Sequence, residues 1–159
     1  MIKEGEKIPD VPLQVRREGR IDTVSSSEFC AGRRVVIFAL PGAFTPTCSE
    51  KHLPGFLEHS EALRAKGVEA IGCLSVNDAF VMGAWGESLS AGGRVEMLAD
   101  GSGKLTRALG LELDLKDAGF GIRSQRYAMV LSDGVVERLW VEPEHGFGVS
   151  SAESVLAEL

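Results

Sequence analysis

The sequence predicts an α/β domain built on a mixed β-sheet. Short, apolar, β-branched runs alternate with helical segments from residue 35 to about residue 119, which is typical of parallel strands joined by helical crossovers. Two further apolar runs flank the pair Asp133-Gly134, and an Asp-Gly turn between apolar runs indicates an antiparallel hairpin. A sheet with both kinds of pairing follows.

Length and composition favour one globular domain, 1–159. A chain of 159 residues can bury a sizeable core, and 44% hydrophobic with 25% charged residues is ordinary for a soluble protein. The formal net charge of −6 argues against a nucleic-acid partner. No apolar run is long enough to span a membrane, and the start MIKEGEKIPD lacks the apolar segment of a secretory signal. We therefore expect a cytoplasmic protein.

The N-terminal elements are short. Residues 1–12 are charged and contain prolines, so they are expected to form a lead-in segment. The runs 13–17 and 21–24 bracket a glycine turn and predict a hairpin. Residues 25–30 predict a short helix, in which we interpret Cys30 as a small hydrophobic residue near the surface.

The central elements carry the core. The run 35–40 predicts a buried strand, and the following helix, with apolar residues near a 3.6 period, is expected to stop at Gly67. Pro54 lies inside this helix and should kink it or leave a carbonyl unpaired. The run 68–76 predicts a second buried strand with Cys73 as a core residue.

Weaker patterns follow this second strand. The pair 77–78 is expected to cap another helix, which carries Phe80 and Trp85. Residues 95–99 predict a third strand, and 102–119 are expected to be helical in part, with a glycine-punctuated loop after them.

The C-terminal part predicts a hairpin and a helix. The apolar runs 126–131 and 135–141 are its two strands. Residues 150–153, Ser-Ser-Ala-Glu, form a capping box that opens the last helix, which presents Val155 and Leu159.

One stretch carries chemistry, PGAFTPTCSEKHLPGF at 41–56. Thr45 followed by Pro46 predicts a helix N-cap with proline at the first helical position. Cys48 is then the third helical residue, where orphan amides and the helix dipole favour an anion and therefore the thiolate. A free cysteine is more often buried and inert, but the polar turn around Cys48 favours the reactive interpretation.

The cysteine count excludes several classes of site. The three cysteines are an odd number without CxxC spacing, which argues against a disulfide scaffold, a thioredoxin-type dithiol and a zinc site. A reducing compartment is the expected setting.

Three motifs together resemble a known family. Pro41, Thr45 and Cys48 match P-x-x-x-T-x-x-C and resemble the active-site signature of the peroxiredoxins. With LSVNDAFVMGAWG at 74–86 and IRSQRYAMV at 122–130, the chain resembles the type-five branch, which includes the plant type II enzymes. The resemblance implies a thioredoxin-like fold with helices on both faces of the sheet and a short N-terminal extension. It also implies reduction of hydrogen peroxide and organic hydroperoxides without a metal, haem or flavin cofactor.

The resemblance also implies roles for site residues. Cys48 would be the peroxidatic thiolate that becomes a sulfenic acid. Thr45 would place its hydroxyl near the sulfur and the peroxide, and Pro41 would shield the sulfur from water. Arg126 would hold the thiolate and the developing oxyanion; only the resemblance selects it over Arg123.

Other polar residues are expected to be structural. His52 lies one turn beyond Cys48; it is either a proton acceptor or, as we expect, a partly exposed residue at the pocket edge. Surface or capping positions are expected for the remaining candidates, namely His59, His145, Glu50 and Asp78.

The sequence departs from the type-five pattern in one place. Some members carry a resolving cysteine near the C-terminus, but residues 146–151 read GFGVSS here. Besides Cys48, only Cys73 matches a cysteine position of the family. We therefore expect a one-cysteine cycle in which glutathione with glutaredoxin, or else thioredoxin, is the reductant. Two alternatives remain open: a redox sensor that relays oxidation from Cys48 to a partner protein, and a non-catalytic thioredoxin-like module.

The resemblance further implies a homodimer built from loops beside the active site. Four aromatic residues are expected at that end of the sheet, at an interface or in the domain core: Phe44, Phe80, Trp85 and Phe120. We expect Phe44 and Phe80 near the contact.

Overall fold

A computed structural model describes residues 1–144 and 146–159 and contains the expected mixed sheet. Seven strands run in the order β2-β1-β5-β4-β3-β8-β9, and β6 pairs with β7 separately. Strands β3, β4 and β5 pair in parallel, and the other pairs are antiparallel. The strands are β1 Pro12–Arg17, β2 Arg20–Ser25, β3 Arg34–Ala39, β4 Ala70–Ser75, β5 Glu96–Ala99, β6 Glu112–Leu115, β7 Gly121–Ser124, β8 Tyr127–Ser132 and β9 Val135–Val141.

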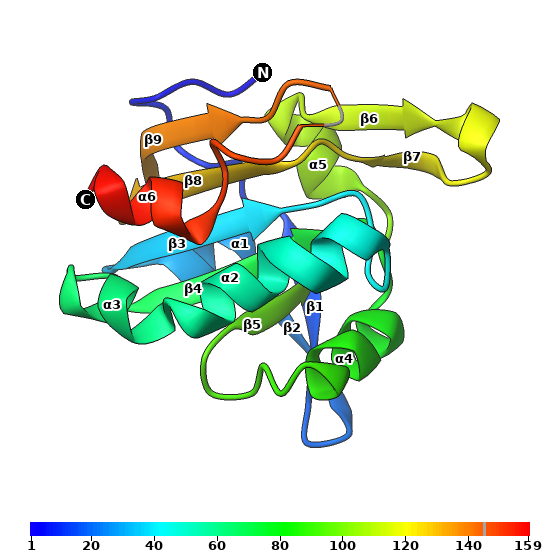
Figure 1. Ribbon diagram of the computed structural model, residues 1–159, viewed down its shortest axis with the longest axis horizontal. Coiled ribbons are helices and arrows are strands. Elements are labelled where there is room, and N and C mark those ends of the chain that lie inside the picture. The colour runs from blue at the N-terminus through cyan, green and yellow to red at the C-terminus, as the bar shows by residue number, and fades with distance from the viewer. Residues whose placement is uncertain (145) are drawn as a thin grey trace.

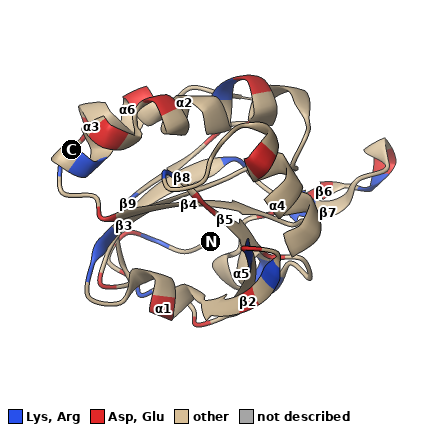
Figure 2. Cartoon of the chain, turned by 90° about the horizontal axis from the view of Figure 1, so that it is seen from below, with Lys and Arg blue, Asp and Glu red and all other residues tan. Residues whose placement is uncertain are grey.

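Helices cover both faces of the sheet (Figures 1 and 2). On one face lie α2 Leu53–Glu58, α3 Ser60–Ala65, α4 Ala79–Ser88 and α6 Ala152–Ala157. On the other lie α1 Ser26–Cys30 and α5 Lys104–Leu109. Two further turns are η1 Cys48–His52, a π-helical turn, and η2 Lys116–Ala118, a 3₁₀ turn. None of the helices among the described residues is long and apolar enough to cross a membrane.

Strand β3, in the interior of the sheet, shows why the core has two halves. Val36 and Phe38 pack under α2 and α4, whereas Val35 and Ile37 pack on the α1 and α5 side. Successive side chains of a strand point to opposite faces, so a strand covered on both faces reads as one continuous apolar run.

Most short elements form where the sequence predicts them. The β1–β2 hairpin turns through Glu18 and Gly19, both with positive φ, as a two-residue turn of this kind requires. Ser25 caps α1, and Asp78 caps α4 by accepting from the Val81 amide at 2.9 Å. Cys30 differs from the expectation: it is fully buried, and burial raises the pKa of its thiol to about 11.

The helix after β3 is broken where one continuous helix was expected. It begins at Pro46 as predicted and then forms the π-turn η1, in which the Leu53 amide bonds to the Cys48 carbonyl. Pro54 has no N–H to continue the α-helical ladder, so a change of helical register is accommodated there. A second break at His59 divides α2 from α3, and the helix stops before Gly67.

The region 102–119 contains α5 and η2 but also a strand that the sequence does not reveal. β6 pairs with β7 in a hairpin that projects from the body of the molecule (Figure 1). Its sequence ELDL alternates exposed and half-buried side chains, so it lacks the apolar run that marks the other strands.

The C-terminal helix begins one residue later than the capping box predicts. Ser151, not Ser150, caps α6 and accepts from the Ser154 amide at 3.2 Å. The Glu153 carboxylate instead pairs with His59 Nε2 at 3.0 Å.

Candidate active site

The loop that follows β3 is held from the neighbouring strand. The Asn77 side-chain oxygen accepts from the Ala43 amide at 2.9 Å and from the Ser75 hydroxyl at 2.7 Å. Asn77 therefore ties residues 41–45 to the end of β4, a role that the sequence does not indicate because the contact spans 34 positions.

Thr45 closes the turn before the active-site helix. Its hydroxyl donates to the Gly42 carbonyl at 2.7 Å, so the expected side-chain cap is replaced by a bond back into the loop. A side chain at Gly42 would lie 3.3 Å from Thr45 Cγ2 and 3.1 Å from Arg123 Nη1, so this close turn favours glycine. The first backbone bond runs from the Ser49 amide to the Thr45 carbonyl at 3.0 Å, which leaves Cys48 among the first-turn amides.

Arg126 contacts the sulfur from a part of the sequence 78 positions away. It directly precedes β8, and its Nη2 donates to Cys48 Sγ at 3.2 Å. Arg123, the competing candidate, donates instead to the carbonyl oxygens of Pro41 and Phe120. Of the two arginines, Arg126 is therefore the one that contacts the sulfur.

His52 is not at the pocket edge but fully buried. Its Nδ1 lies 2.9 Å from Arg126 Nη1, and its Nε2 lies 3.0 Å from the Ser150 carbonyl oxygen. Because arginine can only donate and a carbonyl can only accept, the imidazole is neutral with its proton on Nε2. Burial and the charge of Arg126 lower the pKa of His52 to about 3.

Glu142, at the end of β9, is a site residue that the sequence does not reveal. Its Oε2 accepts from the Ser150 hydroxyl at 2.7 Å, the Ser150 amide at 2.8 Å and the Gly148 amide at 2.7 Å. Burial would raise the pKa of this carboxyl, but the hydrogen bonds from Ser150, Gly148 and Val149 outweigh it and lower the pKa.

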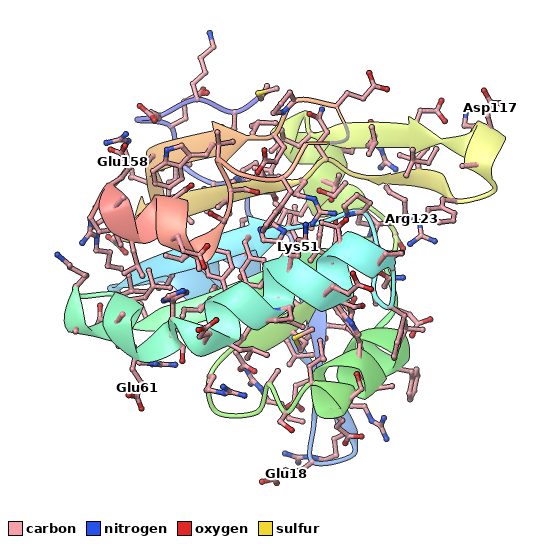
Figure 3. All side chains as sticks on the ribbon, viewed as in Figure 1. Glu18, Lys51, Glu61, Asp117, Arg123 and Glu158 are labelled. Carbon is pink, nitrogen blue, oxygen red and sulfur yellow. The ribbon has the colours of Figure 1, made fainter. Side chains whose placement is uncertain are left out.

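A pocket of about 870 Å³ is lined in part by Arg126, the residue that contacts the Cys48 sulfur. Cys48 itself is 1% exposed; Pro41, Thr47 and Arg126 line the pocket. Lys51, on η1 (Figure 3), also borders it. The β6–β7 hairpin and the segment after β9 supply the other lining residues, among them Leu113, Asp114, Leu115, Gln125, Glu142, Pro143, Glu144, Gly146 and Phe147.

Neither Cys73 nor Cys30 lines this pocket, although Cys73 belongs to the same buried cluster as Cys48. Cys73 lies in the middle of β4, fully buried, and burial raises its pKa well above the ordinary range. Cys30 is buried on the opposite face of the sheet. All three cysteines are free thiols.

The weaker candidates are structural where the structure describes them. Glu50 is exposed on η1, Asp78 caps α4, and His59 is half-buried and paired with Glu153. His145 lies outside the described residues.

A sheet of this topology, with a thiol in the first turn of the helix after the interior strand β3 and an arginine on the sulfur, defines a thioredoxin-like thiol redox protein. The model of the Redoxin family matches residues 3–156, so the chain belongs to this family. Its relatives place it among the peroxiredoxins, the thiol-dependent peroxidases of the family.

Three comparisons illustrate this. Peroxiredoxin-2E-2 of Oryza sativa subsp. japonica is 54% identical over 99% of this chain and 72% of its own length. The structure of reduced Prx3 from Vibrio vulnificus in complex with H2O2 has a TM-score of 0.95 and 49% identity, with 99% of each chain covered. Peroxiredoxin 5 from Alvinella pompejana has a TM-score of 0.87 and 33% identity, covering 99% of this chain and 97% of that one.

Proposed function

We propose that this peroxiredoxin reduces hydroperoxides in a one-cysteine cycle, with Cys48 as the peroxidatic thiolate and glutathione with glutaredoxin as the reductant. The observation that carries the proposal is the 3.2 Å bond to Cys48 Sγ from Arg126, a residue that lines an open pocket. The Vibrio vulnificus relative, 49% identical, has been crystallised with H2O2, which supports a hydroperoxide as the substrate.

The first step forms an S–O bond and breaks the O–O bond. The Cys48 thiolate attacks one peroxide oxygen and becomes a sulfenic acid, while the other oxygen leaves as hydroxide or alkoxide and takes a proton from water. Arg126 stabilises the negative charge as it moves from sulfur to the leaving oxygen. Thr45 bonds back to Gly42 within the loop before Cys48, and Pro41, which lines the pocket, would shield the sulfur from water.

The second step uses an external thiol. Glutathione attacks the sulfenic sulfur, forms a mixed disulfide and releases water; a second thiol, through glutaredoxin, then reduces the disulfide by exchange. The burial of Cys73 and Cys30 supports this route, because a disulfide with either of them needs the sulfur atoms to meet and the site to rearrange.

Cysteine variants test the cycle. The double variant Cys30→Ser/Cys73→Ser is expected to keep peroxide turnover with glutathione and glutaredoxin, whereas Cys48→Ser abolishes it. Mass spectrometry of the peroxide-treated protein with glutathione should show an adduct on Cys48. A stoichiometric Cys48–Cys73 disulfide together with inactivity of Cys73→Ser would reject the one-cysteine cycle, and faster turnover with thioredoxin would replace the proposed reductant.

We also propose a homodimer through the end of the sheet that carries the active site. Phe44, Phe80 and Phe120 are 56%, 63% and 43% exposed, and exposed aromatic side chains gathered at one end favour an interface. Phe44 in addition has a φ of 64°, a strained conformation for a bulky residue that holds its ring outward. Trp85 takes the other of the two expected positions: it is 1% exposed and belongs to the core.

A further inference from the structure

A continuous chain of hydrogen bonds runs from the reactive sulfur into the protein interior. Arg126 donates from Nη2 to Cys48 Sγ at 3.2 Å and from Nη1 to His52 Nδ1 at 2.9 Å. His52 Nε2 donates to the Ser150 carbonyl at 3.0 Å, and the Ser150 amide donates to Glu142 at 2.8 Å. The first three links join residues 78, 74 and 98 positions apart, and the last joins residues eight positions apart.

We propose that His52 is a positioning residue that fixes the Arg126 guanidinium on the Cys48 sulfur, with Ser150 and Glu142 holding the imidazole in place. The proposal rests on the proposed function in so far as it concerns the reaction with peroxide. The placement of the guanidinium itself is a property of the site that can be measured without peroxide.

The donor and acceptor pattern explains why a neutral imidazole suits this role. A guanidinium on a flexible side chain has many orientations, and one bond to a sulfur atom fixes few of them. The Nδ1 acceptor takes one Nη1 proton and turns the planar group so that Nη2 faces the sulfur. Phe147 adds a second constraint, because its ring lies 5.9 Å from the guanidinium carbon and 5.2 Å from the imidazole centroid.

Glu142 holds both ends of this series of hydrogen bonds. The Glu142 amide donates to the Arg126 carbonyl at 2.9 Å, so Glu142 is bound to the backbone of the arginine. Its carboxylate binds the Ser150 amide and hydroxyl, and the Ser150 carbonyl accepts a hydrogen bond from His52 Nε2. His52 also packs against Phe38 and Phe56, at centroid distances of 5.0 and 5.7 Å, which limits tilting of its ring.

Two amide variants separate the two hydrogen bonds of His52. His52→Asn places an acceptor where Nδ1 lies and loses the bond to Ser150, whereas His52→Gln reaches toward Ser150 and loses the acceptor for Arg126. If His52 acts by placing Arg126, the second-order rate constant for peroxide should fall roughly ten- to a hundredfold in His52→Gln and several-fold less in His52→Asn. Equal losses in both variants would contradict the proposal. The control His59→Gln changes a half-buried histidine outside the site and should retain the wild-type rate.

A double-mutant cycle tests whether His52 acts through Arg126. His52→Gln should lower the rate in the wild-type background but hardly at all in Arg126→Gln, where there is no guanidinium to place. Additive losses would overturn the proposal and assign His52 a purely structural role. The rate of alkylation of Cys48 by iodoacetamide should show the same non-additivity, so a failure of peroxidase activity would reject the proposed function and leave the positioning role standing.

Nitrogen-15 NMR of the wild-type protein provides a test that does not depend on the folding of any variant. At pH 7 the His52 signals should show a neutral ring with the proton on Nε2. A protonated Nδ1 in the reduced protein, whether in the other tautomer or in an imidazolium, would overturn the proposal, since neither can accept from Arg126.

Discussion

Cys48 and Arg126 lie 78 positions apart and meet at 3.2 Å. The guanidinium is charged at any pH of interest and presents donors in a fixed fork, so it can serve the sulfur and His52 at once. At this scale the reactivity of the protein depends on a few polar contacts inside a largely apolar core.

Loss of the guanidinium should slow the chemistry at Cys48. Arg126→Gln is expected to lower the rate of reaction with peroxide by a factor on the order of 10²–10³, the usual cost of removing one donor to a developing oxyanion. Stopped-flow fluorescence can follow the reaction, because Trp85 donates to the hydroxyl of Ser49, the neighbour of Cys48, at 3.0 Å. The exposed Arg107→Gln is a suitable control, and an unchanged rate in Arg126→Gln would disprove the role assigned to this arginine.

Burial of His52 predicts acid sensitivity of the fold. Its pKa is lowered from 6.5 to about 3 in the folded protein, so between these values the unfolded chain binds one more proton. The free energy of unfolding should therefore fall by about 1.4 kcal/mol per pH unit as the pH drops below 6.5, in addition to the effects of other groups. Urea denaturation from pH 7 to pH 4 measures this, and His52→Asn should remove that component of the slope. Identical slopes for the two proteins would refute the prediction.

At the scale of elements, a buried carboxylate caps the first turn of α5. Asp100 follows β5 and is almost fully buried, and its carboxylate accepts from the Leu105 amide, the Thr106 amide and the Thr106 hydroxyl at 3.1, 2.8 and 2.7 Å. α5 has only six residues, so its stability comes from these bonds and from packing more than from helix propensity.

Removal of this cap should be costly. Asp100→Ala leaves three donors without their acceptor in the interior, and we expect a loss of roughly 2–4 kcal/mol of unfolding free energy. Chemical denaturation gives the value. Asp117→Ala, at the tip of the exposed hairpin (Figure 3), is the matched control and should change stability by less than about 0.5 kcal/mol. A similar small change in Asp100→Ala would show that α5 does not depend on the cap.

At the scale of the whole molecule, the active-site loop, the start of α4 and the β6–β7 hairpin lie at one end of the sheet (Figure 1). The exposed aromatic residues Phe44, Phe80 and Phe120 belong to these three segments. A partner subunit seated there would border the pocket, so association and catalysis would be linked.

Charged substitutions at this end should separate the subunits. The double variant Phe44→Glu/Phe80→Glu is expected to sediment as a monomer at concentrations where the wild type is a dimer, because a dimer interface excludes unpaired charges from its centre. Val135→Glu serves as the control: Val135 is 39% exposed and starts β9, at the sheet end opposite Arg126. A wild-type protein that is monomeric at high micromolar concentration would argue against the homodimer.

The sequence by itself determined most of the elements and the local half of the site. Apolar runs specify β3, β4 and β8 because these strands are buried on both faces, and Thr45-Pro46 specifies the helix start because the preference of proline for the first helical position is local. Pro41, Thr45 and Cys48 are therefore brought together by eight consecutive residues.

Only the tertiary structure decided the long-range contacts of the site. The bonds that join His52 to Arg126 and to Ser150 span 74 and 98 positions, and nothing within a few residues of His52 distinguishes a buried imidazole from one at the pocket edge. The sequence did not predict the β6–β7 hairpin for a related reason: its strands pair with each other outside the main sheet and carry no apolar run. Local patterns record local interactions, whereas burial of a polar side chain depends on partners that packing alone brings within reach.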